Sequence, residues 1–194
     1  MSIRGGKDPV VCARCAVSGQ CCCTLTPGQE DMCFPVSELE RQRIVEFGPG
    51  RGGLVSAPNS KAFLGHMARL FPKDRAGLGK AFPQGSGHLR LATSKDGRCT
   101  FLSQTGCVLP WEARPYYCRL FPFWVSASAV TAFVAKGCLA GEEGRTVAGM
   151  LDLLGMGPSM VRELHGRMRL AWGFIPEEDL EAAALDRPEL EDDA

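Results

Sequence analysis

Residues 98–123 read RCTFLSQTGCVLPWEARPYYCRLFPF and place three cysteines, Cys99, Cys107 and Cys118, among aromatic and turn-forming residues. CARCAVSGQCCC and MCFP precede this stretch, and KGCLAGEEG follows it with Cys138. The earlier group consists of Cys12, Cys15, Cys21, Cys22, Cys23 and Cys33, so the chain of 194 residues has ten cysteines. Thiolates gathered in this way either pair as disulfides or bind a soft metal, and the alternatives imply different compartments.

The sequence favours metal binding over a disulfide framework. The beginning, MSIRGGKDPVVCARC, lacks the apolar run of a secretory signal. The sequence also contains no run of about 18 apolar residues, so a membrane-spanning helix is not expected. At 45% hydrophobic residues, a chain of this length can bury a core without covalent staples. We therefore expect a cytoplasmic metal-binding protein, with disulfides as the alternative.

Charge divides the chain into two parts. The formal net charge is zero, yet residues 176–194 contain nine acidic residues and one arginine, so this tail carries −8 and the remainder +8. We expect one domain over residues 1–175, followed by an acidic, solvated and flexible tail at residues 176–194. An alternative is that the tail folds back on the basic body and screens a partner site.

Residue patterns predict a small α+β domain with short β-hairpins and several helices around a cysteine-ligated metal site. Ser37 and Glu40 have capping-box spacing at the start of a helix over 37–47, and Ser60 is expected to cap a helix over 61–71. The remaining expectations are a hairpin turning at Asp96-Gly97, a short helix after Pro115 that carries Cys118, a hairpin over 123–135 that delivers Cys138, and helices over 145–155 and 158–172. Residues 1–33, 50–58 and 73–87 are predicted to be irregular.

Spacing within the clusters suits metal coordination. The two residues inside a CxxC turn let both thiolates reach one ion, and Cys12 and Cys15 form such a pair. Cys22 and Cys23 are close enough in sequence to add ligands, and Cys99 and Cys107 bracket a turn through Gly106. We expect the two groups to meet in space, so that metal ties the N-terminal segment to the body of the domain.

These motifs resemble a known family. A CxxC followed by a cysteine pair, then CTFL, GCVLPWEARPYYCRLFPF and KGCLAG, is similar to the bacterial and archaeal CxxCxxCC domain, often called YkgJ-like. Members are described as zinc- or iron-chelating proteins, and related cysteine patterns occur in flagellin lysine N-methylases. The resemblance covers most of residues 12–141. The gap between Cys15 and the cysteine pair is longer here, and Pro110 and Trp111 replace the usual Ile-Tyr type of residues.

The resemblance implies a ligand set. We align Cys22 and Cys23 with the family's pair and treat Cys21 as the spare, although the other register would use Cys21 and Cys22. The predicted metal ligands are Cys12, Cys15, Cys22, Cys23, Cys99, Cys107, Cys118 and Cys138. An iron–sulfur cluster is slightly favoured over zinc, since a zinc-only site does not require so many thiols. The histidines, His66, His88 and His165, are expected to be ordinary surface or core residues.

Residues beside the second cluster have two interpretations each. Glu112 and Arg114 are expected to form an ion pair or hydrogen bonds to the thiolate sulfurs; the alternative is that Arg114 caps a turn. Arg119 is expected either to place positive charge near the thiolates or to face solvent on its helix. The aromatic residues of 116–124 are expected to form a core beneath the site.

The predicted function is a metal-binding protein that holds zinc or an iron–sulfur cluster in metal handling, electron transfer or as a cofactor-bearing subunit. The alternative is an iron–sulfur-dependent protein-modifying enzyme resembling flagellin lysine N-methylase, so enzymatic activity is left open. A zinc-stabilised interaction module is a third option. The expected partners are the metal ion or cluster and, as an option, another protein; neither a nucleic acid nor a membrane is expected.

Overall fold

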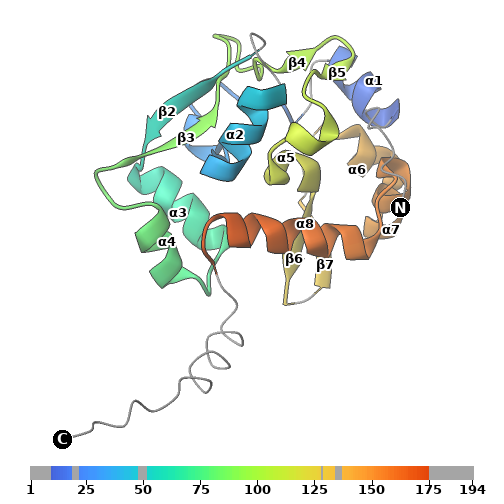
Figure 1. The fold of residues 1–194 in the computed structure, drawn as a ribbon. Helices are drawn as coiled ribbons and strands as arrows, with labels where there is room; N and C mark the ends of the chain where they lie inside the picture. The colour runs from blue at the N-terminus through green and yellow to red at the C-terminus, as the bar shows by residue number, and fades with distance from the viewer. Residues whose placement is uncertain (1–9, 19–21, 48–51, 128, 134–136, 175–194) are drawn as a thin grey trace, which may run out of the picture.

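The computed structural model describes residues 10–18, 22–47, 52–127, 129–133 and 137–174. Its short antiparallel sheets are separate from one another and lie in different parts of the molecule (Figure 1). One sheet has three strands in the order β1-β3-β2, formed by β1 (Pro35–Val36), β3 (Gly87–Leu91) and β2 (Leu54–Pro58). Two hairpins accompany it, β4 (Leu102–Ser103) with β5 (Gly106–Cys107) and β6 (Phe123–Ser126) with β7 (Ala129–Ala132). With the helices around them, these sheets make a small mixed α+β fold, which is the predicted fold class.

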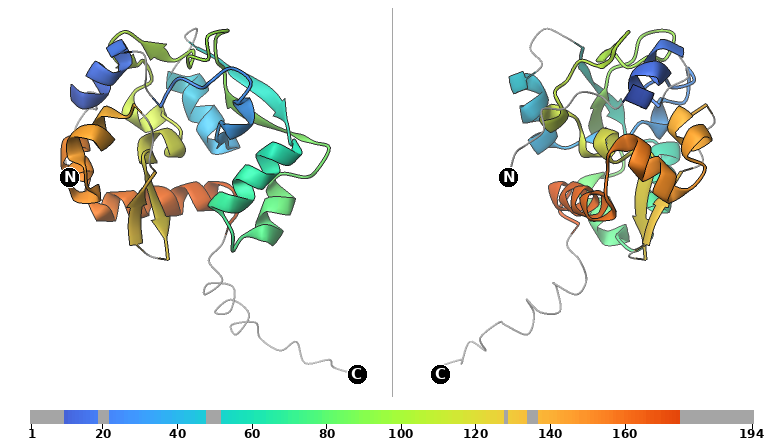
Figure 2. Two further views of the ribbon diagram at one scale, coloured as in Figure 1. Left: turned by 180° about the vertical axis from the view of Figure 1, so that it is seen from behind. Right: turned by 90° about the vertical axis from the view of Figure 1, so that its right-hand side faces the viewer.

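Helices lie between and beside the sheets (Figure 1). In chain order they are α1 (Val10–Ser18), the 3₁₀ turn η1 (Glu30–Met32), α2 (Glu38–Phe47), α3 (Lys61–Leu70), α4 (Arg75–Ala81), the 3₁₀ turn η2 (Trp111–Ala113), α5 (Tyr116–Leu120), α6 (Leu139–Gly144), α7 (Val147–Leu154) and α8 (Pro158–Ala171). α8 crosses the base of the molecule, with α3 and α4 at one end and α6 and α7 at the other (Figures 1 and 2).

Local capping explains two of the predicted helix starts. At α2 the backbone N–H of Ser37 donates to Oε2 of Glu40 at 2.8 Å, and the N–H of Glu40 donates to Oγ of Ser37 at 3.4 Å. This reciprocal pair is the predicted capping box. At α3 the hydroxyl of Ser60 accepts from the N–H of Phe63 at 3.0 Å, as its position predicted. The hairpin β6–β7 and the helices α7 and α8 also form where the sequence predicts them.

Three segments that were expected to be irregular are ordered, and those predictions were wrong. α1 makes residues 10–18 helical and therefore places Cys12 and Cys15 on one face of a helix, one turn apart. β2, an edge strand, occupies residues 54–58, and the glycines before it and Pro58 at its end weaken the sequence signal for a strand. α4 lies at residues 75–81, and two glycines weaken its sequence signal.

The predicted hairpin around Asp96-Gly97 forms only next to its turn, where the N–H of Ser94 donates to the carbonyl of Arg98 at 2.8 Å and the N–H of Thr100 donates to the carbonyl of Ala92 at 2.9 Å. β3 pairs with β1 and β2, so that Leu89 lies opposite both Val36 and Ser56. The turn itself forms, since Gly97 has φ +82° and its N–H donates to the carbonyl of Ser94 at 2.9 Å. Beyond the turn, an isolated bridge pairs Thr93 with Cys99, and the chain then enters the separate hairpin β4–β5.

The hydrophobic core lies in two parts. The larger cluster packs α3, α5, β6 and α8 together and includes Phe63, Phe123, Val161 and Met168, each fully buried. The smaller cluster consists of Val36, Ile44, Phe101 and Leu109, and Cys99 and Cys107 pack against it. Two of the predicted ligands thus lie on a rigid apolar support. No helix among the described residues combines the length and apolar character needed to cross a bilayer.

Candidate functional site

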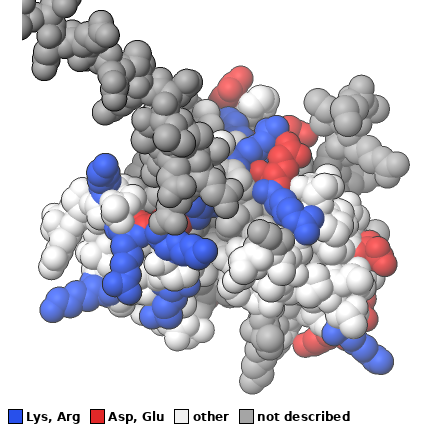
Figure 3. Space-filling model, turned by 90° about the horizontal axis from the view of Figure 1, so that it is seen from below, with Lys and Arg blue, Asp and Glu red and all other residues white. Residues whose placement is uncertain are grey.

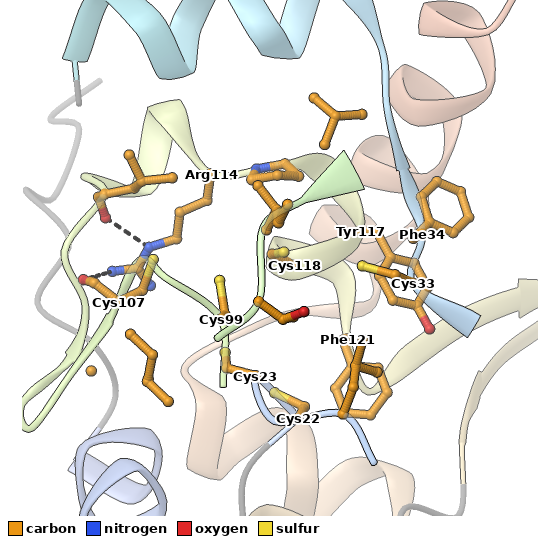
Figure 4. Close-up of a pocket in the computed structure, with 18 of the residues that line it drawn as sticks. Cys22, Cys23, Cys33, Phe34, Cys99, Cys107, Arg114, Tyr117, Cys118 and Phe121 are labelled. Atoms are coloured by element: carbon orange, nitrogen blue, oxygen red, sulfur yellow. Dashed lines mark hydrogen bonds between the residues drawn. The ribbon is translucent and has the colours of Figure 1, made fainter. Parts of the chain in front are cut away.

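Cysteines from separate parts of the chain border one pocket of about 290 Å³ (Figure 4). α1 contributes Cys12 and Cys15, the segment before β1 contributes Cys22, Cys23 and Cys33, and the second cluster contributes Cys99, Cys107 and Cys118. The pocket therefore contains seven of the eight predicted ligands. The fold therefore brings thiols that are up to about a hundred residues apart in the chain, from Cys12 to Cys118, to one hollow.

Backbone pairing holds the two cysteine groups together. The N–H of Cys99 donates to the carbonyl of Cys23 at 2.7 Å, and the N–H of Leu25 donates to the carbonyl of Gly97 at 2.9 Å. Thr24 forms a bridge with Arg98 between them. The segment after the cysteine triplet thus runs antiparallel to the segment that begins the second cluster, which fixes Cys23 beside Cys99.

A buried carboxylate positions the helix that carries Cys118. The backbone N–H of Tyr116, in the first turn of α5, donates to Oε1 of Glu40 at 2.6 Å. Glu40 is 2% exposed, and its other oxygen accepts from the N–H and the hydroxyl of Ser37. One side chain therefore caps both α2 and α5. Pro115, at the N-cap position of α5, suits this start because its ring fixes the backbone there.

The thiols shift one another's protonation. Cys118 is accessible to solvent where it borders the pocket, yet burial among protein atoms raises the pKa of its thiol well above the usual value, and Cys23, Cys99 and Cys107 raise it further. Burial likewise raises the pKa of Cys33, which the charge of Arg90 partly opposes. These directions describe a compact group of thiols in apolar surroundings. A bound cation would reverse them, because thiolate ligands are deprotonated.

Aromatic and aliphatic side chains form the rest of the wall. Phe34, Tyr117 and Phe121 border the pocket, and the rings of Phe34 and Tyr117 stack with their centroids 4.4 Å apart. Burial raises the pKa of Tyr117, with Cys118 and Cys22 adding to the shift. The predicted aromatic core beneath the site is therefore present, and part of it is also wall.

Arg114 is the charged residue of the lining and is 8% exposed. Its Nε donates to the carbonyl of Leu109 at 2.9 Å and its Nη2 to the carbonyl of Cys107 at 3.2 Å (Figure 4). The side chain thus ties the loop after β5 to the start of α5 and places a positive charge beside the thiols. Arg119, in contrast, lies over the rings of Trp111 and Tyr116, 5.2 Å and 5.7 Å from their centroids, and does not line the pocket.

Two of the sequence expectations lie elsewhere. Cys138 is the N-cap residue of α6 and does not line the pocket. Cys21, the predicted spare, lies outside the described residues. Sequence reasoning left Cys33 out of the ligand set, although its place just before the Phe-Pro of β1, ten residues after Cys23, was a usable signal. None of the three histidines lines the pocket, and all three are buried.

The donor atoms fit a soft metal in kind, but they do not form a ready-made coordination group. In the part of the chain that the structure describes, no three His, Cys, Asp or Glu side chains are arranged to hold a metal ion. The described cysteines are not joined to one another by disulfides. Thiolate is the ligand that zinc and iron–sulfur clusters share.

No family model, curated protein or solved structure matches the chain. The similarity to the CxxCxxCC domain therefore rests on the cysteine motifs quoted above.

Proposed function

We propose that the cysteine-lined pocket binds a soft metal, as an iron–sulfur cluster or as zinc, and that the protein acts in metal handling, electron transfer or as a cofactor-bearing subunit. The observation that carries the proposal is the convergence of eight cysteines, from α1, the 22–33 segment, β5 and its approach, and α5, on one pocket. The fold thus brings thiols from segments far apart in the chain to one hollow.

The surroundings support an anionic metal centre. Four thiolates around a divalent ion leave a net negative charge, which is costly to bury unless positive groups lie near it. Arg114 supplies such a group, held against the carbonyl of Cys107. The apolar wall of Phe34, Tyr117 and Phe121 would lie against the centre, and apolar surroundings tune the potential of a cluster.

The ligands would come from Cys22, Cys23, Cys33, Cys99, Cys107 and Cys118, with Cys12 and Cys15 on α1 completing the set. Since the described residues hold no ready-made group of three, binding has to draw these side chains together and is coupled to local ordering. Eight thiols are twice the number that one four-coordinate zinc or one iron–sulfur cluster requires, so the lining can supply two centres or one centre with spare thiols.

Anaerobic purification with elemental analysis and an absorbance spectrum on the same sample tests the proposal. Brown protein with iron, acid-labile sulfide and absorbance near about 400 nm would support the cluster. Colourless protein with stoichiometric zinc would support a structural centre instead. A folded protein that binds neither metal after anaerobic reconstitution would refute the proposal and favour disulfides.

A second candidate draws on the apolar part of the pocket. Phe34, Tyr117 and Phe121 border the same hollow as the thiols, so an organic side chain could lie next to a bound centre. This arrangement suits the protein-modifying enzyme implied by the methylase resemblance. Single-turnover assays with a methyl donor and a lysine-containing peptide, on iron-loaded protein, separate this candidate from a carrier.

A further inference from the structure

The end of α3, the loop after it and α4 form a basic surface. It consists of Arg69, Lys73, Arg75 and Lys80, all exposed. Within residues 61–88 the acidic residue is Asp74, and both of its oxygens accept from Arg169 of α8, at 2.6 Å and 2.8 Å. Asp74 therefore does not neutralise the basic surface. Figure 3 shows Lys and Arg side chains gathered on this side of the base of the molecule.

The chain leaves the described body beside this surface. α8 ends at Ala171, and Phe174 is 2% exposed, with its ring centroid 5.0 Å from that of Phe71. A Cβ built on Gly77 of α4 would lie 2.9 Å from Cδ1 of Phe174, so the phenylalanine packs directly on α4. Figures 1 and 2 show the end of α8 next to α3 and α4 from both sides.

The residues that follow are complementary in charge. Residues 177–194 contain nine carboxylates and one arginine. An extended chain covers about 3.3–3.6 Å per residue, so six residues span about 20 Å, twice the length of a helix of seven residues. The acidic segment is long enough to reach every member of the basic surface from its anchor at Phe174.

We propose that the acidic C-terminal segment, residues 177–194, docks on the basic surface of its own chain and covers it against other polyanions. Tethering gives the segment an effective concentration on the order of millimolar, which a separate acidic partner would have to exceed. Individual exposed ion pairs contribute about 0–1 kcal/mol and are screened by salt, so docking is reversible and salt-dependent. The pocket has no lining residue from α3 or α4, and this inference is therefore independent of the proposed metal.

Zero-length carbodiimide coupling of the full-length protein at low ionic strength tests the docking. The reagent joins a carboxylate to a lysine amine where the two are in contact, and peptide mass spectrometry of the monomer band identifies the pairs. We expect the tail carboxylates to couple to Lys73 and Lys80 in preference to the exposed Lys95. In about 1 M salt, where the Debye length is about 3 Å, coupling to these lysines should fall about tenfold.

Charge reversal on the basic surface provides the matched comparison. Arg69→Glu with Arg75→Glu retains both lysine amines but reverses their electrostatic neighbourhood, and coupling to Lys73 and Lys80 should fall. Arg145→Glu with Arg162→Glu makes the same change in net charge at exposed positions away from the surface and should leave coupling intact. Equal coupling to Lys95, equal effects of the two variants, or coupling confined to a cross-linked dimer would each overturn the proposal.

Discussion

The backbone N–H of Cys99 donates a hydrogen bond of 2.7 Å to the carbonyl oxygen of Cys23. This bond joins two cysteine clusters that are far apart in sequence, and it does so through main-chain atoms. Cys99 also packs on the small core of Val36, Ile44, Phe101 and Leu109. The first cluster is thus held in place by the second, whose own position is fixed by packing.

Loss of a thiol from the second cluster should empty the site. Cys118→Ser and Cys107→Ser each remove a soft ligand from a structured element, α5 and β5 respectively, and should sharply lower bound metal and destabilise the fold. Metal content per chain and absorbance near about 400 nm are the measurements. Cys21→Ser is the control and should have a mild effect. If it empties the site while Cys23→Ser does not, the register of the triplet is wrong.

Cys33 and Cys138 should behave oppositely to what sequence spacing suggested. Cys33 borders the pocket, whereas Cys138 begins α6 and does not. Cys33→Ser should therefore reduce metal content or shift the visible spectrum, and Cys138→Ser should leave both unchanged. The two variants make the same chemical change, so each is a control for the other. Equal metal loss in both would mean that the bound state recruits Cys138.

The turn that joins the clusters depends on Gly97. Its φ of +82° disfavours side chains, and a Cβ there would collide with the carbonyl oxygen of Leu25. Gly97→Ala should separate residues 23–25 from residues 97–99 and lower metal retention without removing a thiol. Gly85 has the same φ of +82° with open space around it, so Gly85→Ala carries only the conformational cost of about 1–2 kcal/mol. Urea unfolding and metal content compare the two; equal losses would show that the contact with Leu25 is unimportant.

Glu40 should be a stability determinant outside the pocket. Glu40→Gln keeps the shape but replaces one acceptor with an amide donor that faces the N–H of Tyr116 or the groups of Ser37. A buried group left unsatisfied costs about 1–3 kcal/mol, so the free energy of unfolding should fall by that amount. Glu38→Gln, on the exposed side of the same helix, should change it little. Similar urea midpoints for the two variants would contradict the proposed double cap.

The sequence predicted the helix caps and the hairpin that depend on contacts between residues close together in the chain. The capping box at Ser37, the cap at Ser60 and the hairpin β6–β7 each depend on neighbouring residues. The partners of β3 could not be read in this way, because β2 ends at Pro58 and β1 at Val36, 29 and 51 residues before β3 begins at Gly87. The chain pairs with itself next to Asp96-Gly97, as predicted, whereas β3 beyond this short ladder pairs with β1 and β2.

The candidate site divides in the same manner. Residue type and clustering identified seven of the thiols that border the pocket. Motif spacing alone does not report that Cys33, just before β1, borders the pocket, nor that Cys138, at the start of α6, lies outside its lining. The sequence did not predict α1, because the CxxC spacing of Cys12 and Cys15 suits a metal-binding loop as well as one face of a helix. The hidden cap at Glu40 joins residues 76 positions apart, a contact that no local pattern signals.

His165 should make stability depend on pH. Its ring is 9% exposed and meets the ring of Trp124 edge-on, with centroids 4.8 Å apart. Burial, followed by the nearby charge of Arg169, lowers its pKa to about 4, while Asp74 opposes the shift. The unfolded chain binds a proton near pH 6.5 and the folded chain resists it. The stabilising contribution is therefore complete above about pH 6.5 and is lost as the pH falls towards 4, up to about 3 kcal/mol.

The variant His165→Phe isolates this effect. It keeps an aromatic ring against Trp124 but has no titratable group, so the difference in unfolding free energy between variant and wild type should grow in the variant's favour from pH 7 to pH 4. Urea titrations at several pH values give this difference directly, and they cancel the acid sensitivity of His66 and His88, whose pKa values burial also lowers. A difference that does not change with pH would show that His165 is protonated as easily in the folded as in the unfolded chain.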